Sequence, residues 1–265
     1  MSTLREIVYN SVIAIHRRTG KEWIPLKEIY EEVDKNRDVG INNGGASVRA
    51  ALETHSALSE VFSGTEEYIL KEKGSGLYKS IYYDQIKFIK NMNIGDVFTR
   101  DQLMAVFKIS GQSGIMKTNS LNCLVLTTSE ENGVYCDSTV ENGFITYTGE
   151  GLTGDQTITK NNKTIYESNE NDLPMYLFSK DNNKKYIFEG QVKLCAEPYQ
   201  VIEKDIDGND RLVWKFPLSI VYPNDYDFEK NENFSEIVYK ITEIESKIYS
   251  DMIEEQNDLE YIEGK

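Results

Sequence analysis

The chain has 265 residues, 39% of them hydrophobic, and a formal net charge of −15. This length allows one large domain or two smaller domains, each with its own core. No apolar run reaches the roughly 18–20 residues that a membrane span requires, and the N-terminus lacks a secretion-signal pattern. We therefore expect a cytoplasmic protein that has no membrane partner.

Cysteine and histidine usage restricts the possible chemistry. Cys123, Cys136 and Cys195 are widely spaced and form no CxxC pair. This spacing argues against a disulfide framework or a structural zinc site. The histidines, His16 and His55, both lie near the N-terminus. We expect no metal site and no cofactor.

The acidic charge is unevenly distributed along the chain. Residues 226–265 hold 12 acidic and 4 basic residues, whereas residues 1–80 hold 12 acidic and 11 basic ones. A nearly neutral first segment can carry a basic face. The net charge therefore does not exclude a nucleic-acid partner.

Three helical patterns followed by a hairpin pattern occupy residues 1–80. Helices are predicted over residues 3–19, from Pro25 onward, and over residues 47–55. Strands are predicted over residues 62–70, from Phe62 and the run 67–70, and over residues 77–78, joined by a tight basic turn. This order is that of a winged helix-turn-helix domain.

The segment GGASVRAALETHS…KGSGLYK also resembles winged-helix modules of bacterial restriction and DNA-processing proteins. The resemblance implies that Ser47, Arg49 and His55 lie on or near a recognition helix, and that Lys71 and Lys73 lie on the wing and meet phosphate. Winged helices also serve as protein–protein modules, in which case these residues are solvated charges.

Residues 81–93 predict a linking helix that ends at Gly95. From Val97 onward, short β-rich runs recur every 10–20 residues, which is typical of a compact curved sheet or barrel. Helices are predicted over residues 100–107 and 161–168. We expect three aromatic residues in the core of this sheet: Phe178, Tyr186 and Trp214.

The last segment has a different pattern. Apolar residues from Phe234 to Met252 follow helical spacing, and acidic residues occupy the other face, which predicts an amphipathic acidic helix. This helix could dock on its own β domain, pair with a second copy of the chain to form a homodimer, or bind another partner.

The stretch from Tyr135 to Gln156 carries the strongest indication of a binding site. A tyrosine stands two residues before Asp137, and glycines at 149, 151 and 154 allow close approach of the backbone to a bound group. Aromatic rings beside a carboxylate and such a loop suit a pocket for a flat, polar ring. A plain hairpin with a glycine-rich turn is the alternative.

A series of short motifs surrounds this stretch in a fixed order: IGDVFTRDQL (94–103), GQSGI (111–115), YCD (135–137), YTGEGLTGDQ (147–156), NNKTI (161–165), PMYLF (174–178), YIFEGQVKL (186–194) and DRLVWKFPL (210–218). The series resembles the SRA domain, the reader of modified cytosine, in the version found in bacterial modification-dependent restriction endonucleases. The resemblance implies an α+β protein in which a PUA-type curved β-barrel domain flips one nucleotide into a pocket.

The same resemblance assigns roles within the pocket. Tyr135 and Tyr147 would stack on the base, and Asp137 would accept from the cytosine amino group. Thr148 and Gly149 would line the pocket near the 5-substituent. Four residues would brace the pocket loop: Gly151, Asp155, Gln156 and Asn162. Gln112 and Ser113 would approach the gap that the flipped base leaves.

Two departures from the family pattern bear on function. The loop after Gly149 is too short for the finger with which mammalian-type SRA domains read the opposite strand. We also expect this chain to lack the HNH nuclease of the restriction-enzyme relatives, since no histidine follows His55 in the sequence. A degenerate metal site formed by Asp181, Glu189 and Lys193 remains the alternative nuclease centre.

These observations predict four parts: a winged-helix domain over residues 1–80, a linking helix over 81–93, an SRA-like domain over 94–226, and an acidic helix and tail over 227–265. The predicted function is recognition of 5-methyl- or 5-hydroxymethylcytosine in double-stranded DNA for restriction or phage defence, with a separately encoded nuclease as partner. A modification-dependent nuclease or base-excising enzyme, and a transcriptional regulator, are the alternatives.

Overall fold

The computed structural model of the chain describes residues 3–35, 45–62, 67–110, 113–129 and 143–221. The chain divides into two compact units. The first consists of Met1–Met92, Met104–Lys108 and Thr118–Asn122, and the second of Asn93–Leu103, Ile109–Lys117 and Cys123–Lys265. Most of the predicted linking helix therefore belongs to the first unit.

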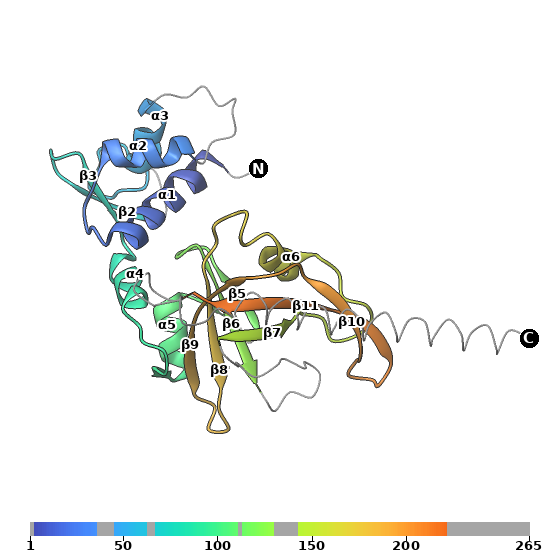
Figure 1. Cartoon of the computed structure of the whole chain (residues 1–265). Coiled ribbons are helices and arrows are strands. Elements are labelled where there is room, and N and C mark those ends of the chain that lie inside the picture. Colours follow the sequence, from blue (N-terminus) through green and yellow to red (C-terminus); the bar gives the residue numbers. More distant parts are fainter. Residues whose placement is uncertain (1–2, 36–44, 63–66, 111–112, 130–142, 222–265) are drawn as a thin grey trace, which may run out of the picture. The chain divides into compact units, whose positions relative to one another are not determined.

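The first unit combines helices with a small sheet (Figure 1). Its elements, in chain order, are α1 (Leu4–Thr19), β1 (Ile24–Pro25), α2 (Leu26–Lys35), α3 (Gly45–Glu53), β2 (Ile69–Glu72), β3 (Leu77–Ser80) and α4 (Tyr83–Lys90). The strands form an antiparallel sheet in the order β1-β3-β2. The predicted order of helices and hairpin is present, with β1 as an additional strand.

Several boundaries in this unit differ from the prediction. Pro25 belongs to β1, and α2 begins one residue later. Phe62 lies outside the strand that was assigned to it, and Lys71 lies in β2 instead of the turn. His55 follows the end of α3, where its backbone carbonyl accepts from the amides of Tyr68 and Ile69. A propensity pattern places such ends only to within a few residues, because packing decides the last turn.

The ends of α1 follow from its sequence. Thr3 and Glu6 form a reciprocal capping box at the start, and Gly20 ends the helix in the left-handed region with φ of 72°. Glycine adopts this conformation without a steric penalty from Cβ. The apolar face of α1, including Val12 and Ile15, packs in a core with residues of α2, α3 and the small sheet.

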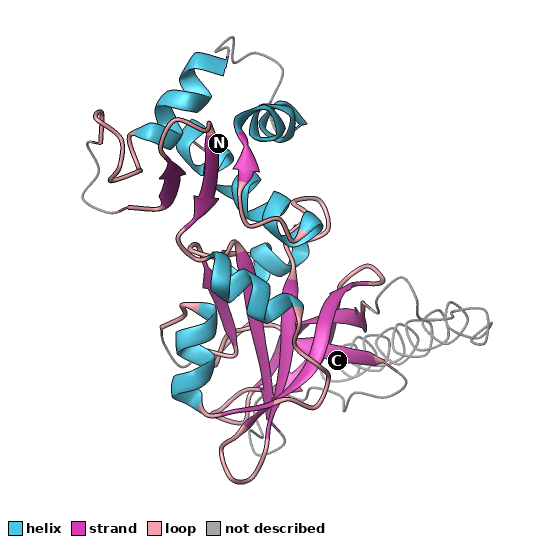
Figure 2. Cartoon of the chain, turned by 90° about the vertical axis from the view of Figure 1, so that its left-hand side faces the viewer, coloured by secondary structure: helices cyan, strands magenta, loops and turns pink. Residues whose placement is uncertain are grey.

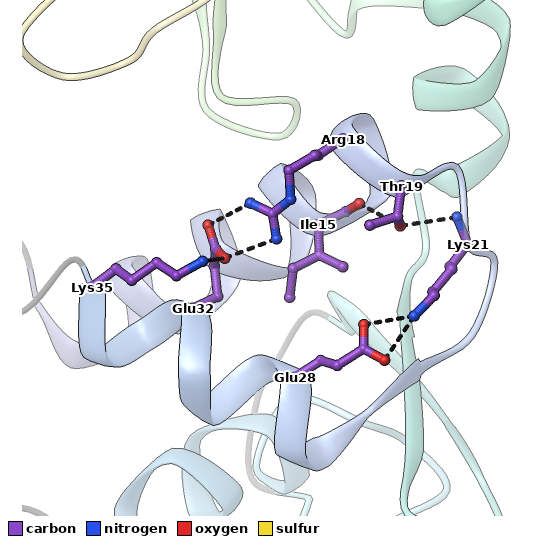
Figure 3. Close-up of polar contacts among 7 residues, drawn as sticks. All are labelled: Ile15, Arg18, Thr19, Lys21, Glu28, Glu32 and Lys35. Carbon is purple, nitrogen blue, oxygen red and sulfur yellow. Dashed lines mark hydrogen bonds and ion pairs between the residues drawn. The ribbon is translucent and has the colours of Figure 1, made fainter.

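A charged cluster joins α1 to α2 (Figure 3). The Arg18 guanidinium donates to both carboxylate oxygens of Glu32 at 3.1 and 2.9 Å, and Lys35 lies 3.0 Å from the same carboxylate. The Glu32 side chain is 9% exposed. The hydrogen bonds from Arg18 lower the pKa of Glu32 below its ordinary value of 4.5.

We expect Glu32→Gln to lower the free energy of unfolding of the first unit by about 1 kcal/mol at pH 7. This value is the upper end of the range for exposed ion pairs, because Glu32 is buried and only its partner is exposed. Because the pKa of Glu32 is lowered in the folded state, its contribution is complete above the ordinary pKa of 4.5 and disappears as the pH falls through the folded value. Chemical denaturation at pH 7 and at pH 3 measures both effects. The matched control is Glu31→Gln, because the 61% exposed Glu31 side chain lies 3.9 Å from Lys27. Equal losses in the two variants would contradict the prediction.

The second unit is built on one large sheet, whose strands lie side by side in Figure 2. Its elements are β4 (Val97–Phe98), α5 (Arg100–Phe107), β5 (Ile115–Thr118), β6 (Cys123–Ser129), β7 (Phe144–Thr148), α6 (Lys160–Tyr166), β8 (Met175–Lys180), β9 (Tyr186–Leu194), β10 (Tyr199–Lys204) and β11 (Asp210–Ile220). The end of α5, from Met104, belongs to the first unit. The predicted helices and β-rich runs are present, and β5 and β10 were not predicted.

The strands of this sheet follow the order β10-β11-β9-β8-β6-β5, with β7 paired to β11 and β4 paired to β9. β6 and β8 run parallel, and every other pairing whose register is known is antiparallel. Parallel strands require a crossover connection. Here the crossover carries β7, the glycine-rich loop and α6, so the sheet topology places the loop beside the sheet.

The core of the second unit collects apolar side chains from six strands and from α6, among them Leu126, Ile165, Leu177 and Phe216. Phe178 is fully buried as predicted, whereas Trp214 is half-buried and packs against the edge of this core.

Cys123 and Cys195 are free thiols. The predicted acidic helix over residues 234–252 lies outside the described residues. Across the described ranges, no helix is long and apolar enough to cross a membrane.

Candidate functional site

The second unit contains a cavity of about 710 Å³. This volume lies within the roughly 300–1,000 Å³ that is typical of small-molecule sites. The cavity is lined by residues from the strands, from the glycine-rich loop and from the start of α6: Arg100, Ser113, Gly114, Ile115, Thr127, Thr128, Tyr147, Thr148, Glu150, Gly151, Leu152, Asp155, Gln156, Thr157, Thr159, Lys160, Asn162, Lys180 and Tyr186.

Gln156 ties the glycine-rich loop to the sheet. Its side-chain amide donates to the Gly149 carbonyl at 2.6 Å, and its Oε1 accepts from the backbone amide of Trp214 at 2.9 Å. Its own backbone amide donates to the Leu212 carbonyl at 2.8 Å. Asp155 adds a contact by accepting from the Leu212 amide at 2.7 Å. The loop is therefore anchored along the middle of β11.

Asn162 fixes the other side of the loop from α6. Its Oδ1 accepts from the Glu150 amide at 2.7 Å, and its Nδ2 donates to the Glu150 carbonyl at 3.0 Å and to the Thr157 carbonyl at 3.1 Å. Asn162 is 2% exposed. Every polar atom of this side chain is thus used to hold loop backbone, which is how buried amides are normally satisfied.

Glycine is required where these amides meet the loop. A Cβ at Gly149 would lie 2.7 Å from Gln156 Oε1 and 2.9 Å from Asn162 Oδ1, closer than real Cβ atoms approach. Gly151 has φ of 140°, and its carbonyl accepts from the Arg211 guanidinium at 2.5 Å. The glycines therefore allow the loop backbone to pack closely against the side chains of Gln156 and Asn162.

Tyr147 forms part of both the core and the cavity wall. Its hydroxyl proton is shared between the carbonyls of Gly114 and Thr127, at 2.8 and 3.2 Å, and the residue is 2% exposed. Two hydrogen bonds at one end of the ring and core packing around it fix the orientation of the ring. The next residue, Thr148, is also buried and lines the cavity.

A buried ion pair lies directly behind Thr148. Lys215 on β11 donates to Thr148 Oγ1 at 2.8 Å and lies 2.5 Å from Glu203 Oε1 on β10. The side chains of Lys215 and Glu203 are 7% and 14% exposed. The fold tolerates a buried lysine here because Glu203 and Thr148 pair with its ammonium group, whereas an unpaired buried charge is strongly unfavourable.

Two basic residues that the sequence did not single out, Arg100 and Lys180, line the cavity together with Tyr186. Lys180 ends β8 and pairs in register with Tyr186, which begins β9 and also pairs with Phe98 of β4. Tyr186 is thus half-buried at the cavity and not within the core as expected. The sequence carries no local signal for this position, because it follows from the register of β9 with β8 and β4.

Three predicted site residues lie outside the described residues: Gln112, Tyr135 and Asp137. Ser113 lines the cavity, where its hydroxyl lies 3.5 Å from the Glu150 carboxylate. The structure therefore brings Ser113, Tyr147 and Thr148 around one space with the loop residues from Glu150 onward, whereas Gly149 is not among the lining residues.

Two of the predicted DNA contacts of the first unit, Arg49 and Lys71, bind one carboxylate. Glu53 Oε1 accepts from Arg49 Nε at 2.8 Å, from Lys71 Nζ at 3.1 Å and from the Tyr78 hydroxyl at 3.2 Å. The hydrogen bond from Arg49 is the main cause of the lowered pKa of Glu53, whereas burial raises the pKa of Tyr78 to about 12. Lys73 is exposed in the turn between β2 and β3. Ser47 is half-buried on α3.

The two carboxylates of the predicted degenerate metal site, Asp181 and Glu189, have structural partners. Asp181 accepts from the backbone amides of Asn183 and Lys185 at 2.9 and 2.7 Å within the β8–β9 turn. Glu189 accepts from the Ser179 hydroxyl at 2.5 Å. Within the described ranges, no three His, Cys, Asp or Glu side chains are grouped so that they could hold a metal ion.

Comparison with known proteins gives one family and several solved structures. The profile of the ScoMcrA-like SRA domain family matches residues 94–247, more than half of the chain. The sulfur-binding and SRA domains of ScoMcrA in complex with phosphorothioated DNA are 13% identical, with 84% of this chain and 86% of that chain covered and a TM-score of 0.50. No curated protein sequence matches.

Two further structures illustrate the range of the matches. The type IV phosphorothioation-dependent restriction endonuclease ScoMcrA is 13% identical, with 85% of this chain and 53% of that chain covered and a TM-score of 0.50. The SRA domain of SUVH5 with fully methylated CG DNA is 24% identical, with 51% and 93% covered and a TM-score of 0.40. At these identities the structural matches concern the fold and not the ligand.

Proposed function

We propose that this chain, which belongs to the ScoMcrA-like SRA domain family, binds double-stranded DNA that carries a 5-modified cytosine and takes the flipped base into its cavity. The observation that carries the proposal is the cavity itself, which lies within the family match and is walled by Tyr147, Thr148 and the braced glycine-rich loop. Flipping costs a few kcal/mol of unstacking, which contacts inside a pocket must recover.

The arrangement of the walls supports these roles. Stacking on aromatic rings supplies roughly 1–3 kcal/mol per base, and the ring of Tyr147 is already fixed by its two hydrogen bonds. We assign Tyr135 as the second stacking residue and Asp137 as the acceptor for the cytosine amino group. Gly149 and Thr148 would lie beside the 5-substituent. The proposed chemistry is binding without a covalent step.

We infer that the first unit is a winged helix-turn-helix domain that adds duplex contacts. Its helix order and its β1-β3-β2 sheet support this assignment. Lys73 on the exposed turn is the proposed phosphate contact, because Arg49 and Lys71 are engaged by Glu53. A separately encoded nuclease would act after recognition in restriction or phage defence in the cytoplasm, and residues 227–265 would join two copies of the chain.

A second candidate ligand is phosphorothioated DNA. The match to the two-domain ScoMcrA structure covers 84% of this chain, which extends well beyond the residues of the family match. That structure contains phosphorothioated DNA. In this alternative the first unit would contact the sulfur-bearing backbone and the second unit would bind the adjoining duplex.

We expect the chain to bind duplexes with one 5-methyl- or 5-hydroxymethylcytosine more tightly than the same duplex with cytosine. Asp137→Asn is expected to reduce the ratio of these affinities by about tenfold, because a base-edge contact is worth about 1–3 kcal/mol. Fluorescence anisotropy at fixed salt measures the affinities. A 2-aminopurine beside the modified base reports flipping by its increased fluorescence.

The matched control is Asp84→Asn, which makes the same charge change on the exposed face of α4 in the first unit. A duplex with a single phosphorothioate and unmodified cytosine tests the second candidate. Equal affinity for the three cytosine duplexes, unchanged by Asp137→Asn, would overturn base recognition.

A further inference from the structure

One side of the cavity presents a carboxylate in a fixed position. Glu150 is held through its backbone by Asn162, and its Oε2 accepts from Asn161 Nδ2 at 2.9 Å. Asn161 is itself positioned by a hydrogen bond to the Ile115 carbonyl at 3.2 Å. An ionised carboxylate accepts hydrogen bonds and donates none. This side of the cavity therefore suits a ligand group that donates.

Another side presents cations. Arg100 begins α5, and Lys180 ends β8 beside Tyr186; all three residues line the cavity. Guanidinium and ammonium groups donate hydrogen bonds and attract anions. This side therefore suits a ligand group that is anionic.

The sheet separates the two sides. Ser113, next to the Glu150 carboxylate, directly precedes Gly114, whose carbonyl accepts from the Thr127 amide of β6. From β5 the sheet continues through β6 to β8, which ends at Lys180. Two strand spacings of about 4.8 Å place the two sides roughly 10 Å apart along the sheet. The cavity is therefore negatively charged on one side, at Glu150, and positively charged on the other, at Arg100 and Lys180.

We propose that the cavity holds a nucleotide in one orientation, with a phosphate at Arg100 and Lys180 and a hydrogen-bond donor of the base at Glu150. The reverse orientation places a phosphate against a carboxylate, which is repulsive, and a base amino group against cations that cannot accept. A base amino group has two N–H groups, so it can donate to Glu150 as well as to Asp137, whereas a keto oxygen at that position donates to neither carboxylate. This proposal rests on the proposed function and specifies which residues orient the nucleotide.

The base contact is tested with two duplexes that carry either 5-methylcytosine or thymine opposite an abasic site. The two bases share the 5-methyl group and differ in the amino or keto group, and the abasic site removes differences in pairing. We expect the wild type to prefer 5-methylcytosine and Glu150→Gln to reduce the ratio of the two dissociation constants by about tenfold, because a glutamine side chain accepts and donates. The control is Glu170→Gln, an exposed acid in the turn after α6.

The phosphate contact is tested by the salt dependence of binding to the 5-methylcytosine duplex. We expect Lys180→Gln to reduce the slope of log Kd against log salt by about 1, as the loss of one phosphate contact does. Lys185→Gln makes the same charge change in the exposed turn of the same hairpin and is expected to leave the slope unchanged. Thermal melting verifies that each variant is folded.

The outcomes distinguish this proposal from the proposed function. If the wild type prefers modified over unmodified duplex but Glu150→Gln keeps the base ratio and Lys180→Gln behaves as Lys185→Gln, the orientation is overturned and the function stands. If the wild type shows no preference among the cytosine duplexes, the proposed function fails. Titration with free 5-methyldeoxycytidine monophosphate separates a free nucleotide from one flipped out of a duplex.

Discussion

Lys215→Met is expected to lower the free energy of unfolding of the second unit by about 3–5 kcal/mol, because it leaves a buried carboxylate without its counter-charge. The Glu203 side chain is 14% exposed, and its Oε2 has no hydrogen-bond partner in the described part of the chain. Loss of Lys215 also removes the hydrogen bond to Thr148 Oγ1 in the cavity wall. Urea denaturation followed by tryptophan fluorescence measures the change, since Trp214 lies on the same strand.

The same two strands supply a matched control. Lys204 and Asp210 also pair at 2.5 Å between β10 and β11, but their side chains are 66% and 56% exposed. Lys204→Met is therefore expected to cost less than about 1 kcal/mol. The double variant Lys215→Met with Glu203→Leu should recover most of the loss, because an apolar pair can replace a buried ion pair. A loss in Lys215→Met no larger than that in Lys204→Met would refute the role of burial.

The second large effect is expected for Gln156→Leu, which should destabilise the second unit by about 2–5 kcal/mol and abolish the preference for modified duplex. The substitution leaves the Gly149 carbonyl and the Trp214 amide without the partners that Gln156 supplies. Each buried polar group that is left unpaired costs about 1–3 kcal/mol. Gln156 is 4% exposed, so water does not readily replace the side-chain amide.

Thr153→Val provides the comparison for Gln156→Leu. Thr153 is exposed in the same loop, and surface substitutions of this kind usually change stability by less than about 0.5 kcal/mol. Denaturation curves and anisotropy titrations of the two variants give stability and binding separately. If Gln156→Leu were as stable as the wild type and kept its preference for modified duplex, the loop would not depend on this amide.

The sequence predicted those parts of the fold whose signals are local. The α1 helix carries its capping residues and its apolar period within the 18 residues from Thr3 to Gly20, so its ends were readable. β10 was missed because its side chains alternate only weakly, and every residue except the exposed Lys204 is half-buried in this strand beside β11. A half-buried strand of mixed polarity lacks the period that separates a strand from a loop.

Only some residues of the candidate site could likewise be predicted from the sequence. Tyr147, Gln156 and Asn162 fall within contiguous motifs, so a resemblance could point to them. Lys180 and Arg100 come from separate segments, and only the register of β8, β9 and β4 brings them to one cavity. The pairing of Lys71 with Glu53 likewise depends on the packing of α3 against β2, whereas Arg49 and Glu53 pair at i,i+4 spacing within α3.

The parallel pairing of β6 with β8 has a consequence for how such a site can diversify. The six paired positions between these strands involve only residues 124–129 and 175–180, so the sheet register does not depend on the length of the segment between them. Doubling the length of a connection costs only about 0.6 kcal/mol of closure entropy. Insertions in the connections of this segment, outside β7 and α6, can therefore reshape the ligand-facing walls during evolution, or in the laboratory, while the strands and helices stay the same.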